Sequence, residues 1–292
     1  MAPGGSPTAD RAASGWAGAV ARRAPARVRR PLGPGARTRA VRTLKGLAGI
    51  AIAIALWELI RALGVVPSAY VPGVGSILSA GVEDFGSQLA PAIGDTLKAW
   101  AAGLAITVPA GLVLGVVVGL SRWADAALRV TVEFLRPVPS VALIPIAVLV
   151  FGVSLRMQLL LIVYACLWPI FFNVRYAVQG VDPLLVDTAR VAGLSRPATI
   201  RRVVLPSTLP ALFTGLRIAS SIALVLAVSA ELITGAPGLG KLIVDAQGAM
   251  QIPLSYAAVF VTGIVGFLLN AAFTALDRRA LPWTVAARGE RP

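Results

Sequence analysis

The chain contains no histidine and only one cysteine, Cys166. Without a set of Cys and His ligands we predict no zinc-type metal site, and a lone cysteine cannot form a disulfide framework. Paired catalytic carboxylates and a G-x-S-x-G nucleophile motif are absent as well. We therefore expect no catalytic centre and no metal site. Cys166 lies inside an apolar run and is predicted to be a small packed residue.

Charged residues are also scarce. They make up 14% of the 292 residues, whereas hydrophobic residues make up 57% and the mean hydropathy is +0.80. Soluble domains carry about 25% charged residues. This composition indicates a polytopic membrane protein, and we predict an all-α fold with about six transmembrane helices.

Six apolar segments are long enough to be considered as spans, since crossing the hydrocarbon core takes about 20 helical residues. The third contains three prolines, which would kink or break it, as suits a helix lining a gate. Residues 75–95 are an alternative site for an additional interfacial helix. The six segments are Gly46–Val66, Ala99–Leu120, Pro137–Leu155, Met157–Val174, Ser207–Glu231 and Ile252–Leu276.

The apolar segments divide the chain into three parts. Residues 1–42 are rich in Ala, Gly, Pro and Arg, and we expect a disordered basic tail. A signal peptide does not fit, because the apolar run starts only after Lys45. Residues 43–276 form the predicted transmembrane domain, and residues 277–292 form the predicted C-terminal tail.

Lys and Arg are distributed unevenly between the connections. They number ten in residues 1–45, three in 121–136, six in 175–217 and four after Leu276, while the opposite side holds only four. Because basic residues are retained in the cytoplasm, both termini are predicted to be cytoplasmic in an inner, or plasma, membrane. This asymmetry explains the net charge of +14 without a nucleic-acid partner. The basic N-terminal arm serves as a topology signal or contacts anionic membrane lipid.

The stretch 182–206, DPLLVDTARVAGLSRPATIRRVVLP, is a long polar interruption between two apolar segments. Asp182 is a good N-cap, and Gly193 can end a helix in a left-handed conformation. Ser195 can cap a second short helix, which Leu205-Pro206 would close. The pattern predicts a two-helix knob facing the cytoplasm, either a plain loop or a docking element.

This stretch resembles the EAA loop of ATP-binding-cassette importer permeases, which reads E-A-A-x-x-x-G followed by a hydrophobic residue and Leu-Pro. The spacing fits throughout, and the departures are Asp187 for Glu and Thr188 for Ala. In that family the loop inserts into a groove on the ATPase subunit. The resemblance implies that the coupling residues are Asp187, Thr188, Ala189, Gly193, Val203, Leu205 and Pro206.

The resemblance covers roughly residues 75–276. The sequences LRPVP at 135–139, IP at 144–145, FG at 151–152, WP at 168–169 and ELI at 231–233 are similar to permeases for nitrate, sulfonate, taurine and bicarbonate. It implies a type I importer permease fold, a homodimer, a separate cytoplasmic ATP-binding subunit and an extracytoplasmic solute-binding protein. The chain itself would bind no cofactor, since the partner subunit binds ATP. The solute would be a small anion such as nitrate, a sulfonate or taurine.

The rival from another class is an ion-coupled secondary transporter or channel, which would need acidic residues inside the spans. Such residues are scarce here, and Glu231 is the leading one. It either lines the pathway or lies in water at the outer helix end. The candidate pathway residues are Glu231, Ser220, Ser221, Pro139 and Asn173.

Two glycine patterns have simple interpretations. Residues 235–241, GAPGLGK, match the start of a P-loop, but Leu242 stands where a Ser or Thr should follow. We expect an extracytoplasmic turn there, where a binding protein would dock. On the second span, a repeated small-residue face predicts close helix packing, formed by Gly103, Gly111, Gly115 and Gly119.

Overall fold

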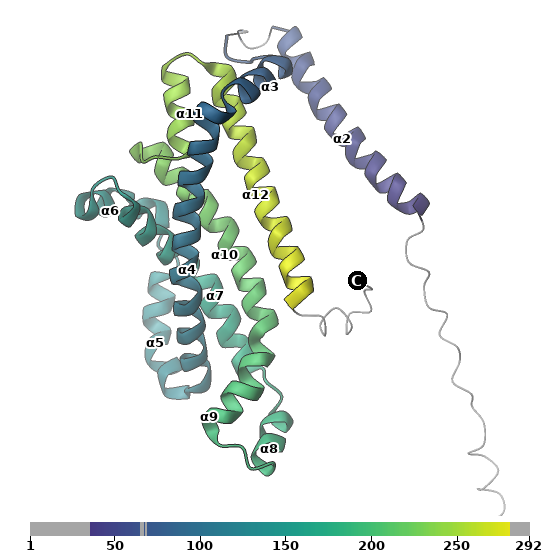
Figure 1. Cartoon of the computed structure of the whole chain (residues 1–292). Helices are drawn as coiled ribbons and strands as arrows, with labels where there is room; N and C mark the ends of the chain where they lie inside the picture. Colours follow the sequence, from purple (N-terminus) through teal and green to yellow (C-terminus); the bar gives the residue numbers. More distant parts are fainter. Residues whose placement is uncertain (1–35, 65–66, 68, 281–292) are drawn as a thin grey trace, which may run out of the picture. The chain divides into compact units, whose positions relative to one another are not determined.

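The computed structural model describes residues 36–64, 67 and 69–280 (Figure 1), and all regular structure within these ranges is helical. The chain divides into two compact units. The first ends at Trp57, and the second begins at Glu58 and contains the helical bundle. The helices are α2 (Ala36–Ala62), α3 (Val74–Glu83), α4 (Ala90–Leu120), α5 (Arg122–Leu135), α6 (Ile144–Phe151), α7 (Leu155–Gln179), α8 (Pro183–Val191), α9 (Arg196–Thr199), α10 (Leu205–Thr234), α11 (Leu239–Gly248) and α12 (Ile252–Ala280). The predicted all-α membrane fold is confirmed.

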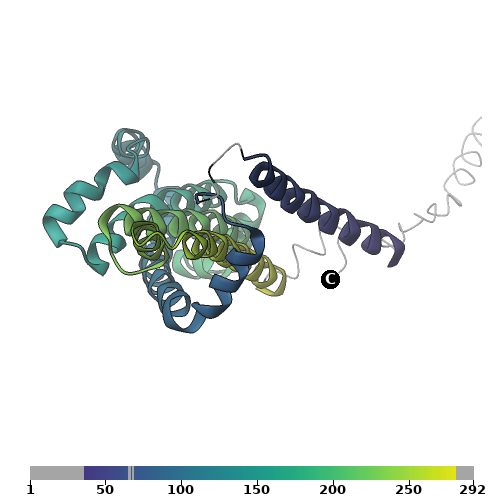
Figure 2. The ribbon, with the colours of Figure 1, turned by 90° about the horizontal axis from the view of Figure 1, so that it is seen from above.

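Four helical stretches are long and apolar enough to cross a membrane, and a bent pair makes a fifth candidate. With α2, which carries the first predicted span, these elements occupy all six predicted apolar segments. In the view from above, the long helices of the bundle are seen roughly along their axes (Figure 2). The four stretches are Phe85–Leu120, Leu155–Gln179, Arg196–Gly248 and Ile252–Ala280.

The predicted third span, Pro137–Leu155, is not one continuous helix. α5 already begins at Arg122, in the predicted loop, and α5 and the Ser140–Phe151 segment are bent by 80°. Pro137 and Pro139 lie in the break, where Pro139 precedes a short 3-10 helix (Ser140–Leu143). Proline removes the backbone N–H that a continuing helix needs, so the expected break is confirmed although the span is divided. Figure 2 shows α6 lengthwise while the long helices are viewed end-on.

Two predicted boundaries shift, and one additional helix is present. Helix α2 begins at Ala36, so residues 36–42 are helical and not part of a disordered tail, while residues 1–35 lie outside the described residues. Helix α12 continues to Ala280, beyond the predicted boundary at 276, and residues 281–292 again lie outside. Residues 75–95 do contain additional helix, as α3 and a π-helical turn (Phe85–Leu89) that leads into α4.

The predicted packing face of α4 is confirmed. A Cβ atom added at any of the four glycines of this face would lie less than 3 Å from a β-branched side chain of α7. Such contacts let two helix backbones approach closely. The glycine and partner pairs are Gly103 with Ile162, Gly111 with Ile170, Gly115 with Val174 and Gly119 with Val178.

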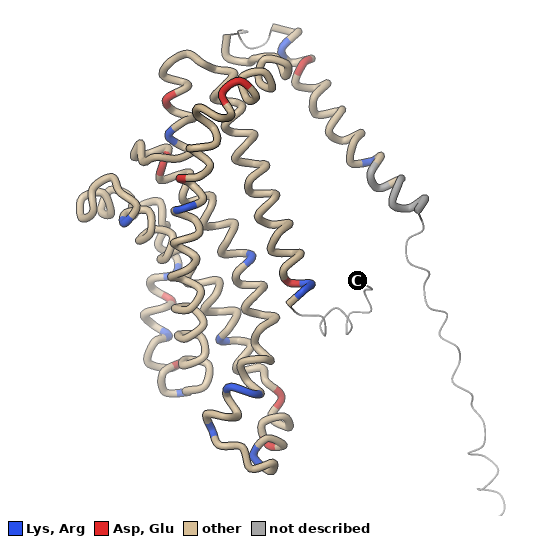
Figure 3. The backbone as a smooth tube through the Cα atoms, in the orientation of Figure 1, with Lys and Arg blue, Asp and Glu red and all other residues tan. Residues whose placement is uncertain are grey.

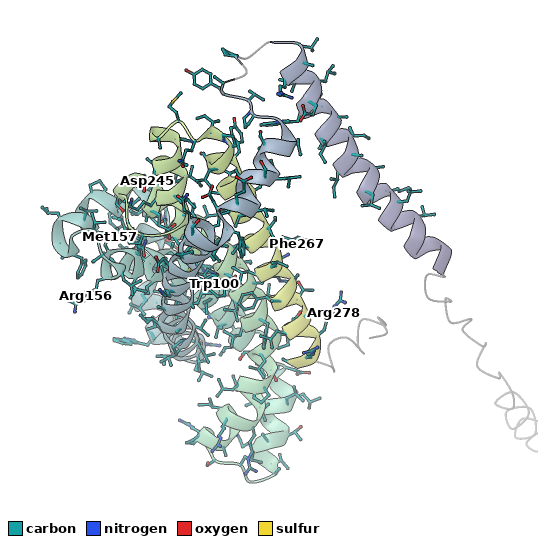
Figure 4. All side chains as sticks on the ribbon, turned by 45° about the horizontal axis from the view of Figure 1, so that its top comes forward. Trp100, Arg156, Met157, Asp245, Phe267 and Arg278 are labelled. Atoms are coloured by element: carbon teal, nitrogen blue, oxygen red, sulfur yellow. The ribbon has the colours of Figure 1, made fainter. Side chains whose placement is uncertain are left out.

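Helix α7 is the centre of the bundle and also packs against α10. Cys166 is fully buried there, and its thiol donates a hydrogen bond to the Ala219 carbonyl oxygen at 3.2 Å. This confirms the prediction of a packed cysteine. Trp100 of α4 lies in the middle of the bundle (Figure 4), where its indole N–H donates to the Ser220 carbonyl oxygen at 3.0 Å. The same ring lies 6.0 Å from that of Phe273 on α12.

Candidate functional site

The stretch 182–206 projects beyond the long helices at one end of the bundle, with α8 and α9 at its tip (Figure 1). The predicted start of α8 is confirmed. The Asp182 carboxylate accepts a hydrogen bond from the Leu184 backbone N–H at 2.9 Å, and Pro183 occupies the first turn. This cap satisfies one of the N–H groups that a helix start leaves unpaired. The N-cap therefore fixes where the projecting helix begins.

The end of α8 is also fixed by its sequence. Gly193 has φ +78°, in the left-handed region, as predicted. The Leu194 N–H donates to the Ala189 carbonyl oxygen at 3.0 Å, and the Gly193 N–H donates to that of Arg190 at 3.0 Å. This pair of bonds is the Schellman motif, which closes a helix through a glycine. A turn without a side chain thus directs the chain from α8 into α9.

The second half of the stretch differs from the prediction. Ser195 precedes α9 but makes no side-chain cap. Leu205-Pro206 does not close a helix, because α9 continues through a π-helical turn (Ile200–Val204) into α10. Ser207 does not cap α10; its hydroxyl donates to the Val203 carbonyl oxygen at 2.7 Å. Pro206 is tolerated because it lies in the first turn of α10, directly after the π-helical turn.

Three apolar side chains are exposed on the outer side of α8. Leu184, Leu185 and Val191 are exposed, Val191 by 90%, while Ala189 is buried on the inner side. Sequence reasoning did not single out Val191, because periodicity does not show which face of a short helix is covered. Together these three side chains form an unpartnered apolar surface, called here the α8 surface, in the described part of the chain.

The predicted coupling residues divide between the tip and the base of this projection. Asp187 forms an exposed ion pair with Arg190 at 2.9 Å, and the Thr188 hydroxyl bonds back to the Leu184 carbonyl oxygen at 2.7 Å. Those on α8 and the turn after it are Asp187, Thr188, Ala189 and Gly193, and those at the base are Val203 in the π-helical turn and Leu205 and Pro206 at the start of α10. Buried Val204, which the motif does not include, anchors the base.

Glu231 lies at the opposite end of α10 and is fully buried, so the alternative that it lies in water is wrong. One carboxylate oxygen, Oε2, accepts hydrogen bonds from the Thr96 hydroxyl at 3.0 Å and the Gly240 N–H at 2.9 Å. The Leu239 N–H in turn donates to the Thr96 hydroxyl oxygen at 2.9 Å. Glu231 therefore connects α4, α10 and the N-terminus of α11, where a negative charge is favoured.

The P-loop-like turn is filled by this carboxylate. A Cβ atom at Gly238 would lie 2.2 Å from the Glu231 carboxyl carbon, and Gly238 has φ +150°. In a P-loop the backbone N–H groups of the turn would hold phosphate. Here the Gly240 N–H is used by Glu231 and that of Leu239 by Thr96. The Leu239 and Gly240 N–H groups are therefore already hydrogen-bonded within the protein.

The remaining pathway candidates lie in different surroundings. Ser220 and Ser221 border a groove of about 420 Å³ between α10 and α12, together with Ser229 and Thr262. Ser220 is buried and Ser221 is exposed. These four hydroxyl groups are the polar part of the groove lining. Its remaining lining is apolar or glycine, mainly leucine and valine.

Asn173 and Pro139 are not in that groove. The Asn173 amide donates to the Pro169 carbonyl oxygen of its own helix at 2.7 Å, beside the close contact with Gly215 of α10. Pro139 is exposed in the break between α5 and α6. The structure therefore does not bring the five candidates together into one site.

Comparison with known proteins shows similarity to transport permeases. The family described as "Binding-protein-dependent transport system inner membrane component" matches residues 107–282. The Bacillus subtilis (strain 168) protein named as an aliphatic sulfonates transport permease, SsuC, is 30% identical over 84% of this chain and 90% of its own length. The taurine transport permease TauC of Escherichia coli (strain K12) is 29% identical over 80% and 87%. The nitrate import permease NrtB of Leptolyngbya laminosa is 34% identical over 65% and 68%.

Solved structures show the same fold. The MetNI methionine transporter in an inward-facing form matches with a TM-score of 0.58 and 20% identity, covering 68% of this chain and 98% of that one. An amino acid transporter crystallised with histidines matches with a TM-score of 0.56 and 17% identity, covering 69% and 95%. At this identity the likeness concerns the fold alone, which is that of a type I importer permease.

Proposed function

The chain belongs to the family of inner membrane components of binding-protein-dependent transport systems, and on that premise we propose how it carries solute and receives energy. It is a permease subunit of an ATP-binding-cassette importer and, as in its family, not a catalytic protein. We propose that it forms the solute pathway and that the segment 182–206 couples this pathway to a separate ATPase subunit. The observation that carries the coupling role is the α8 surface.

The α8 surface has the properties of a docking site. Leu184 and Leu185 are exposed beside Val191 on a helix whose two ends are fixed by the Asp182 cap and the Gly193 turn. A rigid, exposed apolar surface is costly in water unless a partner covers it. The short helix is continuous in backbone with α10 through α9, so a force applied to α8 would reach a long membrane helix directly.

The orientation of the chain follows from its charges. Lys and Arg gather around α8 and α9 and at the end of α12 (Figure 3). Since basic residues remain on the cytoplasmic side, this distribution supports a cytoplasmic position for the α8 surface and for both termini in the inner membrane. The opposite end, with α11 and the turn at 235–240, would then face an extracytoplasmic solute-binding protein.

The mechanism follows from this arrangement. ATP bound by the partner ATPase dimer closes that dimer, two α8 surfaces move together, and the membrane helices switch from inward-open to outward-open. Hydrolysis then resets them. One chain offers one α8 surface, so we propose a homodimer of this permease that meets two ATPase subunits.

The solute we propose is a small oxyanion. The relatives carry the names of sulfonate, nitrate and taurine permeases, and these solutes share an anionic oxygen-rich group. The rival proposal, an ion-coupled secondary transporter, would require no ATPase. Within the described residues, Glu231 is the only carboxylate that is fully buried, and it is held by Thr96 and Gly240 rather than lining a cavity.

Co-purification tests the coupling role. Val191→Ser removes an apolar contact from the α8 surface, and we expect it to weaken capture of the ATPase subunit roughly tenfold, as for an interface hot spot. Val82→Ser on α3 is the matched control, since Val82 is 78% exposed at the other end of the bundle. Equal capture by the two variants would contradict the docking role. Uptake that continues without any ATPase subunit would favour the secondary transporter.

A further inference from the structure

A second cavity, of about 250 Å³, lies between α5 and α7 beside the end of α4. Small-molecule sites have volumes from about 300 Å³ upward, so this cavity suits a very small ligand. Its lining combines guanidinium groups with aromatic and aliphatic side chains. Those used in the argument are Val132, Arg129, Arg136, Phe172, Arg175 and Tyr176.

The charge in this cavity is positive. Three arginines line it together with two carboxylates, Asp125 and Glu133. Arg175 Nε donates to Asp125 Oδ1 at 2.5 Å, and Arg129 Nη2 lies 3.6 Å from Asp125 Oδ2. Two guanidinium groups therefore share one carboxylate, and the lining keeps a net charge of +1.

Arg136 differs from the other two arginines. Among the described residues, no carboxylate oxygen lies within ion-pair distance of its guanidinium. The guanidinium carbon instead lies 4.7 Å from the centre of the Phe172 ring. A cation–π contact of this kind occupies no hydrogen-bond acceptor, so the guanidinium N–H groups remain available for a ligand. A cation placed this way among membrane helices usually faces a pathway or a ligand.

The position of Arg136 is fixed by a row of aromatic residues on α7. Tyr164, Trp168, Phe172 and Tyr176 recur at every fourth position and so lie along one face of the helix. The Tyr164 hydroxyl donates to the Leu135 carbonyl oxygen at 2.5 Å, which holds the end of α5 against this row. Farther along the row the Phe172 and Tyr176 rings stack at 5.8 Å. Helices α5 and α7 together therefore position Arg136 in the cavity lining.

We propose that this cavity is an oxyanion site on the solute pathway, in which Arg136 contacts the sulfonate or nitrate group. The planar guanidinium fork matches two oxygens of such a group. Phe172, Tyr176 and Val132 provide apolar contact for a short organic chain. The place of the site in transport rests on the proposed function, whereas anion binding itself does not. The head group of an anionic phospholipid offers the same chemistry, so the experiment separates the two ligands.

Thiol modification tests the site directly, because Cys166 is fully buried and a new cysteine would be the one accessible thiol. Val132→Cys places it in the cavity lining of the purified full chain in neutral detergent. Two methanethiosulfonate reagents are compared, one carrying a sulfonate and one a quaternary ammonium. With each rate divided by the rate of the same reagent with a small free thiol, we expect the anionic reagent to react about tenfold faster, as one charge-assisted contact allows, and millimolar methanesulfonate to slow it.

Two further variants show whether Arg136 is responsible. Arg136→Gln in the Val132→Cys background should abolish the preference for the anionic reagent. Arg122→Gln, at the start of α5 and outside the cavity lining, should leave it unchanged. Equal rates for the two reagents, or a preference that survives Arg136→Gln, would overturn the proposal. So would protection by phosphatidylglycerol bilayers but not by methanesulfonate, which would assign the site to lipid.

Reconstituted transport then separates this proposal from the proposed function. In phosphatidylcholine vesicles with the ATPase and the binding protein, Arg136→Gln should lower uptake of the oxyanion at least tenfold while ATPase capture stays normal. Absence of ATP-driven uptake by the unmodified chain would contradict the proposed function. The thiol result would then still support anion binding in the cavity. Normal uptake by Arg136→Gln, beside active unmodified transporter, would remove the site from the pathway.

Discussion

Gly115 on α4 lies so close to Val174 on α7 that a Cβ atom at the glycine would be 2.8 Å from the valine side chain. The same relationship recurs from Gly103 with Ile162 to Gly119 with Val178. In each pair the α7 residue follows its α4 glycine by the same number of residues, so the two helices run parallel and in register. Because β-branched side chains are stiff, they fill the space that the glycines leave with little loss of rotamer freedom.

Adding a single methyl group should therefore separate α4 from α7. In Gly115→Ala the new Cβ would meet the Val174 side chain and, at 3.0 Å, the Phe171 carbonyl oxygen. Overpacking of this kind costs about 1–3 kcal/mol. Thermal unfolding of the purified protein in detergent should show the loss.

Gly94→Ala is the matched control on the same helix. A Cβ there would have no neighbour within 4 Å, and alanine favours helix over glycine by about 0.5–1 kcal/mol. Its stability should be unchanged or higher. If the two variants unfold at the same temperature, the close contact does not hold the helices together.

The sequence predicts one side of this contact but not the other. Four glycines at helical spacing indicate a packing face, whereas Ile162, Ile170, Val174 and Val178 read only as apolar residues of a span. The partner of a packing face depends on which helices meet, and that is decided by the whole bundle. The same limit explains why the prolines at 137 and 139 predict a break but not its 80° angle.

Removing the Glu231 carboxylate should loosen α11. Glu231→Ala leaves the Gly240 N–H unpaired and opens a cavity, and a buried unpaired group alone costs about 1–3 kcal/mol. Glu231→Gln keeps an acceptor oxygen and should cost less. Amide exchange at Leu239 and Gly240 should rise in the alanine variant and stay slow in the glutamine variant. Equal exchange in both would contradict the anchoring role.

The sequence shows the residues of this site but does not show that they contact one another. A lone carboxylate in an apolar span and a glycine-rich turn at 235–240 are both visible in the sequence. That Gly238 has no side chain because the carboxylate occupies its space follows only from the structure. Thr96, the third member of this group, lies 135 residues from Glu231 and gave no signal of its own.

Two arginines that share Asp125 should differ in their effect on stability. Arg175 contacts it at 2.5 Å with both side chains 15% exposed, whereas Arg129 lies 3.6 Å away and is 62% exposed. Arg175→Gln leaves a largely buried carboxylate without its main partner and should cost about 1–3 kcal/mol. Arg129→Gln should cost about 0–1 kcal/mol, as for exposed pairs. Denaturant unfolding measures both, and equal losses would show that burial does not decide the strength of this pair.

Gly193 allows the coupling hypothesis to be tested through backbone conformation alone. A Cβ atom at this position would have no neighbour within 4 Å, so the Cβ itself causes no clash, but φ is +78°. A β-branched residue is strained there, whereas asparagine tolerates the left-handed region. Gly193→Val should therefore disturb the end of α8 and lower both ATPase capture and uptake, while Gly193→Asn should retain most of both.

The comparison of these two variants distinguishes a docking helix from a connecting loop. If α8 is only a connecting loop, a local change in the turn after it should alter neither capture nor uptake, and Gly193→Val would behave like the unmodified chain. If α8 docks as a rigid helix, its exit must be held by the bonds from Leu194 to Ala189 and from Gly193 to Arg190. Limited proteolysis between residues 190 and 196 should then rise in the valine variant, in step with the loss of capture.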